Sequence, residues 1–548
     1  MTTDPLNNLA HRIPVDVLRL QAEERSEQVF LRDADTSLTY GEVDALADRF
    51  AKGFSDLGVG VGSRVALFMD NSADLAVTAF GVNRAGGVWS PFSTEYRGDW
   101  LAELFRASKA EVLVVEAHHL AEVAKLNDLP FKHVIVRGSG GSELEGVVSH
   151  DFADLAKNER WEGSITHDPL DTSAVLWTSG TTGRSKGVMQ PHAVWMLWAQ
   201  RHNDVFRKVQ GPGEVFYYPM PMYNSGGWVM NIFPALVSGG TACIDSRFSV
   251  SDYWDRIRHF GAEHTMTLGT MHIYLMNQPP KPDDADNPLR SLVMAPIVPQ
   301  IMKPFMERFG VERIAAGFGT SEVMGATLYT SDMPLKSGSS GYTVDDDLVE
   351  TRLLDHNDAE VGVGEVGEFC VRPRVPGSLF SGYLDEPEKT IEAFRNLWFH
   401  TGDLGRRDED GELFFVDRKK DALRHKGRNT STFEVEHIAL RHPDVANAAA
   451  VGVKLADLEH EEELMLVLQP NEGAVIDPLE FCKFIDENAP YFFVPRYVKI
   501  VQDFPMTPTG KIQKYVLRDF GVTSDTWDRT KEAPDWAERR PAKAAAMS

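Results

Sequence analysis

The chain has 548 residues and a formal net charge of −25 at pH 7. A chain of this length exceeds the size at which a single hydrophobic core keeps growing, so we expect at least two domains. The acidic charge argues against binding to the phosphate backbone of nucleic acids, which requires a basic face. The three cysteines are widely spaced and form no CxxC pair, so the sequence indicates neither a disulfide framework nor a zinc site.

The location of the protein is predicted from its first residues and from its apolar runs. Residues 1–8 are polar and lack the charged and apolar regions of a secretory signal. No apolar run has the length needed to span a bilayer. Together with the unpaired cysteines, which suit a reducing compartment, this predicts a cytoplasmic protein without a membrane span.

Strand-like runs alternate with helical patterns over residues 38–137. The strands are expected at Arg64–Phe68, Val88–Pro91 and Glu111–Val115, and the helices at Ser72–Ala85 and Gly98–Ala110. This rhythm predicts a largely parallel sheet covered by helices. It resumes with a strand at 174–177 and a helix at 193–205, on which Trp195 and Trp198 are spaced for core packing.

A second, smaller pattern begins after residues 403–428, where Asp403–Gly411 is a charged segment expected to form a turn. The elements expected here are strands Glu412–Val416, Ala448–Val453, Leu464–Leu468 and Tyr497–Val501, and helices Glu434–Arg441 and Pro478–Asn488. We predict an α/β protein with a large N-terminal domain of parallel-rich sheets (1–419) and a small α+β C-terminal domain (420–548). The tail after about Trp527 is expected to be loosely ordered.

The strongest local motif is the run Thr178–Gly187, which directly follows an apolar strand. Its glycines allow backbone N–H groups to approach a polyphosphate, its hydroxyls add donors, and Lys186 supplies a positive charge. The run is not a Walker A loop, because G-x4-G-K-[ST] is satisfied nowhere in the chain. By itself it is as consistent with an ordinary loop as with a phosphate site.

Thr178–Gly187 resembles the phosphate loop of the adenylate-forming (ANL) superfamily, which includes acyl-CoA synthetases, adenylation domains of peptide synthetases and beetle luciferases. Other segments resemble the same family in the same order: Gly317–Glu322, Trp398–Asp403 and Pro508–Ile512. The resemblance covers nearly the whole chain. It implies that a carboxylic acid and ATP give an acyl-adenylate and pyrophosphate, with Mg²⁺, after which the thiol of coenzyme A (CoA) gives acyl-CoA and AMP.

The resemblance also implies a role for individual residues. Phe318 would stack on adenine, Asp403 would accept hydrogen bonds from the ribose, and Glu322 with Thr178 would hold Mg²⁺. The implied nucleotide-binding residues are Thr178, Ser179, Gly180, Thr181, Thr182, Gly183, Ala295, Pro296, Gly317, Phe318, Gly319, Thr320, Ser321, Asp403 and Arg418. Cys370 and Tyr383 fall in segments that we interpret as architectural.

The catalytic residues implied by the resemblance are Lys511, Glu322 and Lys186. A carboxylate and a phosphate approach each other during adenylation, so a cation that touches both lowers the barrier. Lys511 of the small domain would be that cation, Lys420 would be the hinge, and Gly427 would line the path of the CoA arm. Rotation of the small domain would then serve two half-reactions.

The acyl pocket implied by the resemblance consists of Tyr223, Asn224, Gly226, Thr270, Tyr274 and Met324. These residues are mostly apolar, aromatic or small, and no aspartate is present to meet an α-amino group. A hydrophobic acid is therefore expected: fatty, aryl or alicyclic. Asn224 departs from the histidine of many acyl-CoA synthetases, and asparagine carries neither a proton nor a charge.

Two other functions stay open from the sequence. The acceptor could be an amine or a carrier protein in place of CoA, or the chain could be a non-catalytic nucleotide-binding scaffold. No carrier domain follows the small domain, and Lys186, Glu322, Asp403, Arg418 and Lys511 are all present, which disfavours a scaffold. The expected partners are small molecules without nucleic acid, and a homodimer is allowed.

Overall fold

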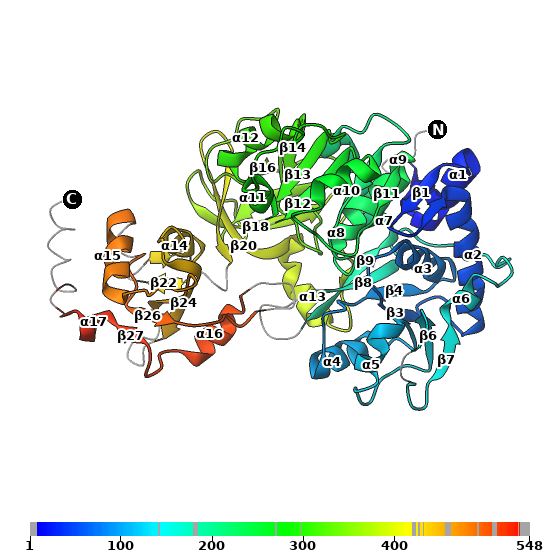
Figure 1. Cartoon of the computed structure of the whole chain (residues 1–548), viewed down its shortest axis with the longest axis horizontal. Coiled ribbons are helices and arrows are strands. Elements are labelled where there is room, and N and C mark those ends of the chain that lie inside the picture. The colour runs from blue at the N-terminus through cyan, green and yellow to red at the C-terminus, as the bar shows by residue number, and fades with distance from the viewer. Residues whose placement is uncertain are drawn as a thin grey trace.

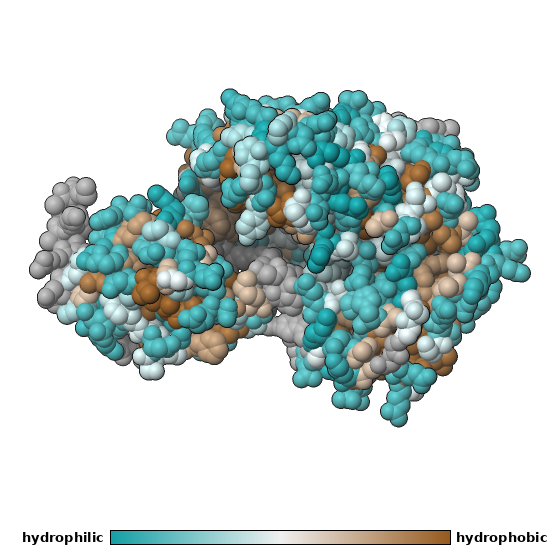
Figure 2. Space-filling view, in the orientation of Figure 1, coloured by the Kyte–Doolittle hydropathy of each residue, from teal (hydrophilic) through white to brown (hydrophobic). Residues whose placement is uncertain are grey.

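The computed structural model describes residues 8–140, 143–178, 185–268, 271–295, 297–418, 423–425, 428–430, 432–454, 462–489, 493–506, 512–534 and 536. The larger part of the chain contains two large sheets with helices packed on them and a smaller antiparallel sheet (Figure 1). In the described part no helix is long and apolar enough to cross a membrane. The face drawn in Figure 2 is mainly hydrophilic, in keeping with the net charge of −25.

The first large sheet has eight strands in the order β19-β9-β8-β4-β3-β5-β6-β7. They are β3 (Arg64–Phe68), β4 (Val88–Pro91), β5 (Val112–Glu116), β6 (His133–Arg137), β7 (Val148–Asp151), β8 (Thr172–Thr178), β9 (Lys186–Pro191) and β19 (Gly382–Tyr383). The strands from β8 to β7 in this order are parallel, and β9 and β19 are antiparallel additions at one edge. The predicted parallel sheet is confirmed.

Helices cover both faces of this sheet. The side chains of a strand alternate between its two faces, so neighbouring residues of one strand pack on different helices. In β3, Val65 and Leu67 pack in the cluster with α2 (Tyr40–Asp56) and α3 (Ala73–Arg84), whereas Ala66 and Phe68 pack in the cluster with α4 (Gly98–Ser108). Shorter helical segments on this sheet are η2 (Ala117–His119), α5 (Leu120–Val123) and α6 (Phe152–Leu155).

The second large sheet has nine strands in the order β16-β15-β14-β13-β12-β10-β11-β1-β2, and the strands from β14 to β1 are parallel. They are β1 (Val29–Arg32), β2 (Ser37–Thr39), β10 (Val215–Tyr217), β11 (Thr241–Cys243), β12 (His264–Leu268), β13 (Ser291–Ala295), β14 (Arg313–Ala316), β15 (Thr327–Thr330) and β16 (Tyr342–Thr343). Further helices of the large domain are η1 (Leu9–Arg12), α1 (Pro14–Arg25), α7 (His192–Arg201), α8 (Ser225–Gly227), α9 (Phe233–Ser238), α10 (Tyr253–Phe260), α11 (Met271–Met276) and α12 (Pro299–Phe309).

The helix predicted at 193–205 differs from the observed one. α7 begins at His192 and ends at Arg201, and the chain continues as a π-helical segment, η3 (His202–Arg207). A second π-helical segment, η4 (Trp228–Ile232), lies opposite it, and His202 Nδ1 is 3.3 Å from the Val229 carbonyl oxygen. Trp195 and Trp198 are fully buried, as predicted.

A third sheet has the antiparallel order β17-β18-β20-β21. The strands are β17 (Val349–Leu354), β18 (Val366–Pro373), β20 (Phe399–Arg407) and β21 (Leu413–Arg418), and α13 (Pro387–Ala393) and η5 (Arg395–Leu397) precede β20. The prediction of a turn over Asp403–Gly411 was therefore wrong for its first half, because β20 continues to Arg407 between β18 and β21. The turn itself is closed by the Asp408 carboxylate, which accepts from the Glu412 backbone N–H at 2.9 Å.

The C-terminal part forms a small α+β unit, coloured orange to red in Figure 1. Its elements are the hairpin β22 (Leu423–His425) and β23 (Arg428–Thr430), the sheet of β24 (Val445–Lys454), β25 (Glu462–Pro470), β26 (Tyr497–Ile500) and β27 (Trp527–Asp528), and α14 (Thr432–Ala439), α15 (Pro478–Asn488), α16 (Lys514–Phe520) and α17 (Arg529–Glu532). It has a hydrophobic core of its own, as expected of a domain. The predicted boundary at 419/420 lies outside the described residues.

The start of the C-terminal tail is ordered, contrary to our expectation. Trp527 packs partly buried against the small core, and β27 pairs with β26. Asp528 caps α17 by accepting from the Thr530 backbone N–H at 3.0 Å. These contacts explain why the chain is held at least to Glu532.

Candidate active site

Lys186, Tyr383 and Glu322 form a connected group at the edge of the eight-stranded sheet. Lys186 begins β9, and the antiparallel neighbour β19 brings Tyr383 beside it. The Lys186 Nζ atom lies 4.2 Å from the centroid of the Tyr383 ring, and the Tyr383 hydroxyl donates to Glu322 Oε1 at 3.0 Å. Burial, together with the neighbouring Glu322 carboxylate, raises the pKa of Tyr383, so its hydroxyl stays a donor at neutral pH.

Tyr383 thus connects the two predicted catalytic residues that the structure describes. The segment of Tyr383 was predicted to be architectural, and this role was not foreseen. Gly382 before it has φ of +132°, a backbone conformation that favours glycine.

The predicted metal and phosphate residue Thr178 lies at the end of β8, directly opposite Lys186 in the antiparallel register. Its hydroxyl donates to the Lys186 carbonyl oxygen at 3.5 Å, a long hydrogen bond. The pairing places the two ends of the phosphate loop together. The loop between them, with Ser179, Gly180, Thr181, Thr182 and Gly183, lies outside the described residues.

Residues 317–325 form a compact turn that holds Phe318 and Glu322. A Cβ atom on Gly317 would lie 2.6 Å from the Thr327 carbonyl oxygen, and one on Gly319 would overlap the Met324 carbonyl group. Only glycine fits at both positions. The turn is closed by the Phe318 carbonyl, which accepts from the Ala326 backbone N–H at 2.7 Å.

Neighbouring elements fix the other side of this turn. Thr320 Oγ1 accepts from the Glu322 backbone N–H at 3.2 Å, and the Ser321 carbonyl accepts from the Gln190 side chain at 2.6 Å. The Phe380 backbone N–H donates to the Glu322 carbonyl at 3.1 Å. The Glu322 backbone is therefore held from both β9 and the segment before β19.

Asp403 is buried in β20, where it pairs in register with Arg418 of β21. Its backbone N–H donates to Thr401 Oγ1 at 3.1 Å, and Thr401 Oγ1 in turn donates to the Phe369 carbonyl at 2.9 Å. The Phe369 ring packs 5.7 Å from the ring of half-buried Phe318. The residues predicted to bind ribose and adenine, Asp403 and Phe318, thus share one neighbour. Nothing is described of the Arg418 side chain.

A buried group of potential metal ligands stands behind Asp403. His400 Nδ1 lies 3.0 Å from Glu368 Oε2 and 3.3 Å from Cys370 Sγ. The other carboxylate oxygen of Glu368 accepts from the Gly402 backbone N–H at 2.9 Å. Glu368 therefore positions the backbone next to Asp403, and His400 holds Glu368, as a structural neighbour would. Cys370 is buried, which agrees with the interpretation of its segment as architectural.

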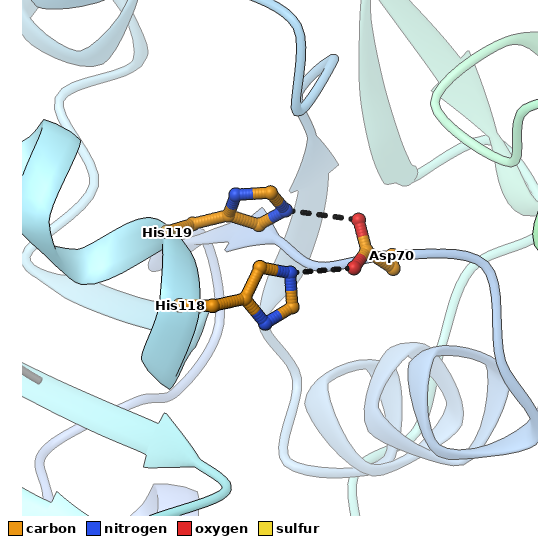
Figure 3. A group of neighbouring side chains, drawn as sticks. All are labelled: Asp70, His118 and His119. Atoms are coloured by element: carbon orange, nitrogen blue, oxygen red, sulfur yellow. Dashed lines mark hydrogen bonds and ion pairs between the residues drawn. The ribbon is translucent and has the colours of Figure 1, made fainter. Parts of the chain in front are cut away.

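A second group of potential metal ligands lies at the carboxyl ends of β3 and β5 (Figure 3). Both imidazoles point toward one carboxylate: His118 Nε2 is 2.9 Å from Asp70 Oδ2, and His119 Nε2 is 2.9 Å from Asp70 Oδ1. This group was not predicted from the sequence, in which two consecutive histidines follow a strand. The next residue, Asn71, donates to the Met220 carbonyl and accepts from the Met222 backbone N–H, so it supports the segment that leads to Tyr223.

We expect Asp70→Asn to reduce stability by about 0.5–1 kcal/mol at pH 7, a value discounted because the pair is half-exposed. The hydrogen bond from His119 is the largest cause that lowers the pKa of Asp70. A carboxylate with a lowered pKa contributes stability above its unfolded pKa, and the contribution is lost as pH falls through the folded pKa. The loss should therefore appear in urea unfolding at pH 7 and vanish at low pH. Glu122→Gln, which removes the exposed pair with Lys125, should leave stability unchanged; equal losses would contradict the assignment.

Of the residues predicted for the acyl pocket, Tyr223, Asn224 and Gly226 follow the carboxyl end of β10. A Cβ atom on Gly226 would be 2.7 Å from the Tyr218 hydroxyl, so the α8 backbone packs directly on that ring. Asn224 precedes α8, and burial raises the pKa of Tyr223. Met324 is buried, with φ of +45°. Tyr274 is 52% exposed on α11.

Several predicted site residues cannot be placed. Ala295 lies at the end of β13, but its neighbour Pro296 is outside the described residues. Besides the five residues of the phosphate loop named above, the predicted residues Thr270, Lys420, Gly427 and Lys511 also lie outside the described residues. Their roles stay predictions.

The fold is that of an α/β protein with two large sheets, a smaller antiparallel sheet and a C-terminal α+β unit. The chain belongs to the family of AMP-binding enzymes: the family model "AMP-binding enzyme" matches residues 18–384, and "AMP-binding enzyme C-terminal domain" matches residues 434–511. Membership in the adenylate-forming superfamily and the predicted fold class are confirmed.

Known proteins agree with this assignment. A crotonobetaine/carnitine–CoA ligase of Salmonella typhimurium (strain LT2) is 30% identical over 505 residues, which cover 88% of this chain and 93% of that protein. The crystal structure of ATP-bound MatB from Rhodopseudomonas palustris has a TM-score of 0.78 at 24% identity, covering 92% of this chain and 98% of that chain. The amide bond synthetase McbA from Marinactinospora thermotolerans has a TM-score of 0.77 at 24% identity, covering 93% and 100%.

Proposed function

We propose that the chain is an ATP-dependent acyl-CoA ligase. In the first half-reaction a carboxylate oxygen attacks the α-phosphorus of ATP, and pyrophosphate leaves. In the second, the sulfur of CoA attacks the acyl carbon of the adenylate, and AMP leaves. The observation that supports adenylation best is the Lys186–Tyr383–Glu322 group, in which a cation and an anion are held by one buried tyrosine.

Each residue of this group has a defined task. The Tyr383 hydroxyl fixes Oε1 of the Glu322 carboxylate. The other oxygen, Oε2, would be the one that meets a ligand. A carboxylate oxygen is the ligand that Mg²⁺ prefers, so Glu322 suits a magnesium that neutralises phosphate charge. Thr178, which pairs with Lys186, would be a second ligand. Lys186 would pair with the phosphate oxygens as pyrophosphate leaves. Buried Asp403 would orient the ribose.

The second half-reaction depends on the small domain. We propose that rotation about Lys420 exchanges Lys511, which serves adenylation, for the Gly427 side, which admits CoA. The transfer to CoA is supported by the carnitine–CoA ligase relative, which covers nearly the same length. The mostly apolar residues around Tyr223 and Met324 support a hydrophobic acid, and three buried free cysteines support a cytoplasmic location.

The hinge is tested by Lys420→Pro. Because proline fixes φ and removes a backbone N–H, we expect it to impair one half-reaction by about tenfold or more while the other is less affected. Pre-steady-state measurement of acyl-adenylate formation and of thioester formation separates the two. Unchanged kinetics in both would contradict the hinge.

A further inference from the structure

Arg207, the last residue of η3, is a buried arginine whose guanidinium is only partly bonded. Its side chain lies in the interior, with the whole residue 2% exposed. Nη2 donates to the Met230 carbonyl at 2.8 Å, from the facing segment η4. Nε and Nη1 are buried without a hydrogen-bond partner. Among the described residues, Arg207 therefore has donors to spare in a place that water does not reach.

Arg207 also forms no ion pair with a carboxylate among the described residues. Three other buried or nearly buried arginines of the large domain differ in this respect: Arg84 pairs with Asp44 and Asp48, Arg201 with Asp346, and Arg308 with Asp284. Burial lowers the pKa of Arg207 to about 9, so it remains charged at neutral pH. A buried charge without a counter-ion is costly, and an arriving anion would relieve that cost.

The position of Arg207 links it to the predicted acyl pocket. Its guanidinium carbon lies 5.6 Å from the centroid of the Phe216 ring. Phe216 of β10 and Tyr218 just beyond it point to the same face of the nine-stranded sheet, since alternate residues of a strand share a face. Tyr218, His202 and His264 are ionisable groups that interact with Arg207. The Tyr218 hydroxyl lies against Gly226, where an added Cβ atom would be 2.7 Å away.

The residue before Arg207 leads to the same region. Phe206 packs with Tyr218, Met266 and Val293 in one cluster. A Cβ atom on Gly317 would lie 3.2 Å from the Phe206 ring, so η3 ends beneath the turn that carries Phe318 and Met324. Arg207 thus lies on the same face of the sheet as Tyr218, and the Tyr218 hydroxyl in turn lies against Gly226 of the predicted acyl pocket. The two π-helical segments that meet at Arg207 are themselves features found often at functional sites.

We propose that Arg207 binds a second anionic group, a carboxylate, at the far end of the acyl substrate. This inference rests on the proposed function and names its substrate class: acids with an apolar middle and a distal carboxylate. The distal carboxylate would accept from Nε and Nη1 and supply the missing counter-charge. An acid with a fixed positive charge at its far end would be repelled by the same guanidinium.

The experiment compares wild type with Arg207→Met, using α,ω-dicarboxylic acids of graded length and the monomethyl ester of each. The readout is the ratio of kcat/KM for diacid over ester, from pyrophosphate release with ATP and CoA, and thioester is identified by mass spectrometry. At the best chain length we expect wild type to prefer the diacid at least about 30-fold, and Arg207→Met to lose that preference while it still accepts the ester. Arg201→Met is the control, because Arg201 already has Asp346, and it should keep the wild-type ratio.

The outcomes separate the inference from the function on which it rests. Turnover of monoacids by wild type with no preference for any diacid would overturn the role of Arg207 and leave the ligase function intact. Absence of pyrophosphate release with every acid would contradict the proposed function itself. If Arg207→Met does not fold, as judged by its melting temperature, Arg207→Lys decides: it keeps the charge with fewer donors and should retain part of the preference. If the folded variant keeps the wild-type ratio of kcat/KM for diacid over ester, the proposal is overturned.

Discussion

Lys511→Ala is expected to lower the rate of acyl-adenylate formation by about 10²–10³-fold, or about 2.7–4 kcal/mol, the typical effect of removing one preorganised donor. The lysine is assigned only to the step in which carboxylate and α-phosphate approach each other. Thioester formation from a chemically supplied acyl-adenylate and CoA should therefore continue at nearly the wild-type rate. Rapid-quench measurement of each half-reaction tests both statements.

The control for this prediction is Lys514→Ala in the same domain. Lys514, the first residue of α16, pairs with Glu436 of α14 at 2.8 Å, and it has no assigned role in adenylation. We expect it to lower stability without a selective effect on either half-reaction. Equal loss of both half-reactions in Lys511→Ala would contradict the assignment of Lys511.

Glu322→Gln is expected to reduce adenylation by a similar factor, about 10²–10³-fold. The substitution keeps the size of the side chain and an oxygen for the Tyr383 hydroxyl but removes the charge that suits Mg²⁺. Titration of Mg²⁺ should show a raised half-saturating concentration, which a purely structural defect would not produce. The measurement is pyrophosphate release against Mg²⁺ concentration at saturating ATP.

Tyr383→Phe separates positioning from charge. It removes only the hydroxyl that donates to Glu322 and keeps the ring beneath Lys186, so we expect a smaller loss of about tenfold. The role of Glu322 in binding Mg²⁺ would be contradicted if Glu322→Gln had the Mg²⁺ dependence of wild type and lost no more activity than Tyr383→Phe. Glu322 would then act through packing alone.

The sequence predicted the large domain well because its signals are local. Strands such as Arg64–Phe68 are short apolar runs, and Ser72 marks the start of α3 by capping it, its hydroxyl accepting from the Leu75 backbone N–H at 3.2 Å. The charged run at 403–411 was misjudged because the pairing of β20 with strands on both sides overrides its turn-like composition. Such pairing depends on residues distant in sequence.

Site residues that belong to a recognisable motif could be predicted from the sequence. Site residues that are brought together only by the fold could not. Lys186, Glu322 and Asp403 belong to recognisable segments. Tyr383, Asp70 and Arg207 become notable only through neighbours far away in the chain: Glu322, the two histidines after β5, and η4. The missing partner of Arg207 in particular is a property of packing, because many buried arginines find a carboxylate within the fold, as Arg84 does.

Analysis of the products made from ATP, CoA and a panel of acids tests the central claim most directly. The panel should contain fatty, aryl and alicyclic monoacids together with the diacids, and the products should be identified by mass spectrometry. We predict AMP, pyrophosphate and the acyl-CoA thioester in equal amounts for at least one acid, with acyl-AMP alone when CoA is left out. Formation of ADP and phosphate, or acyl-AMP that never becomes a thioester when CoA is present, would contradict the account.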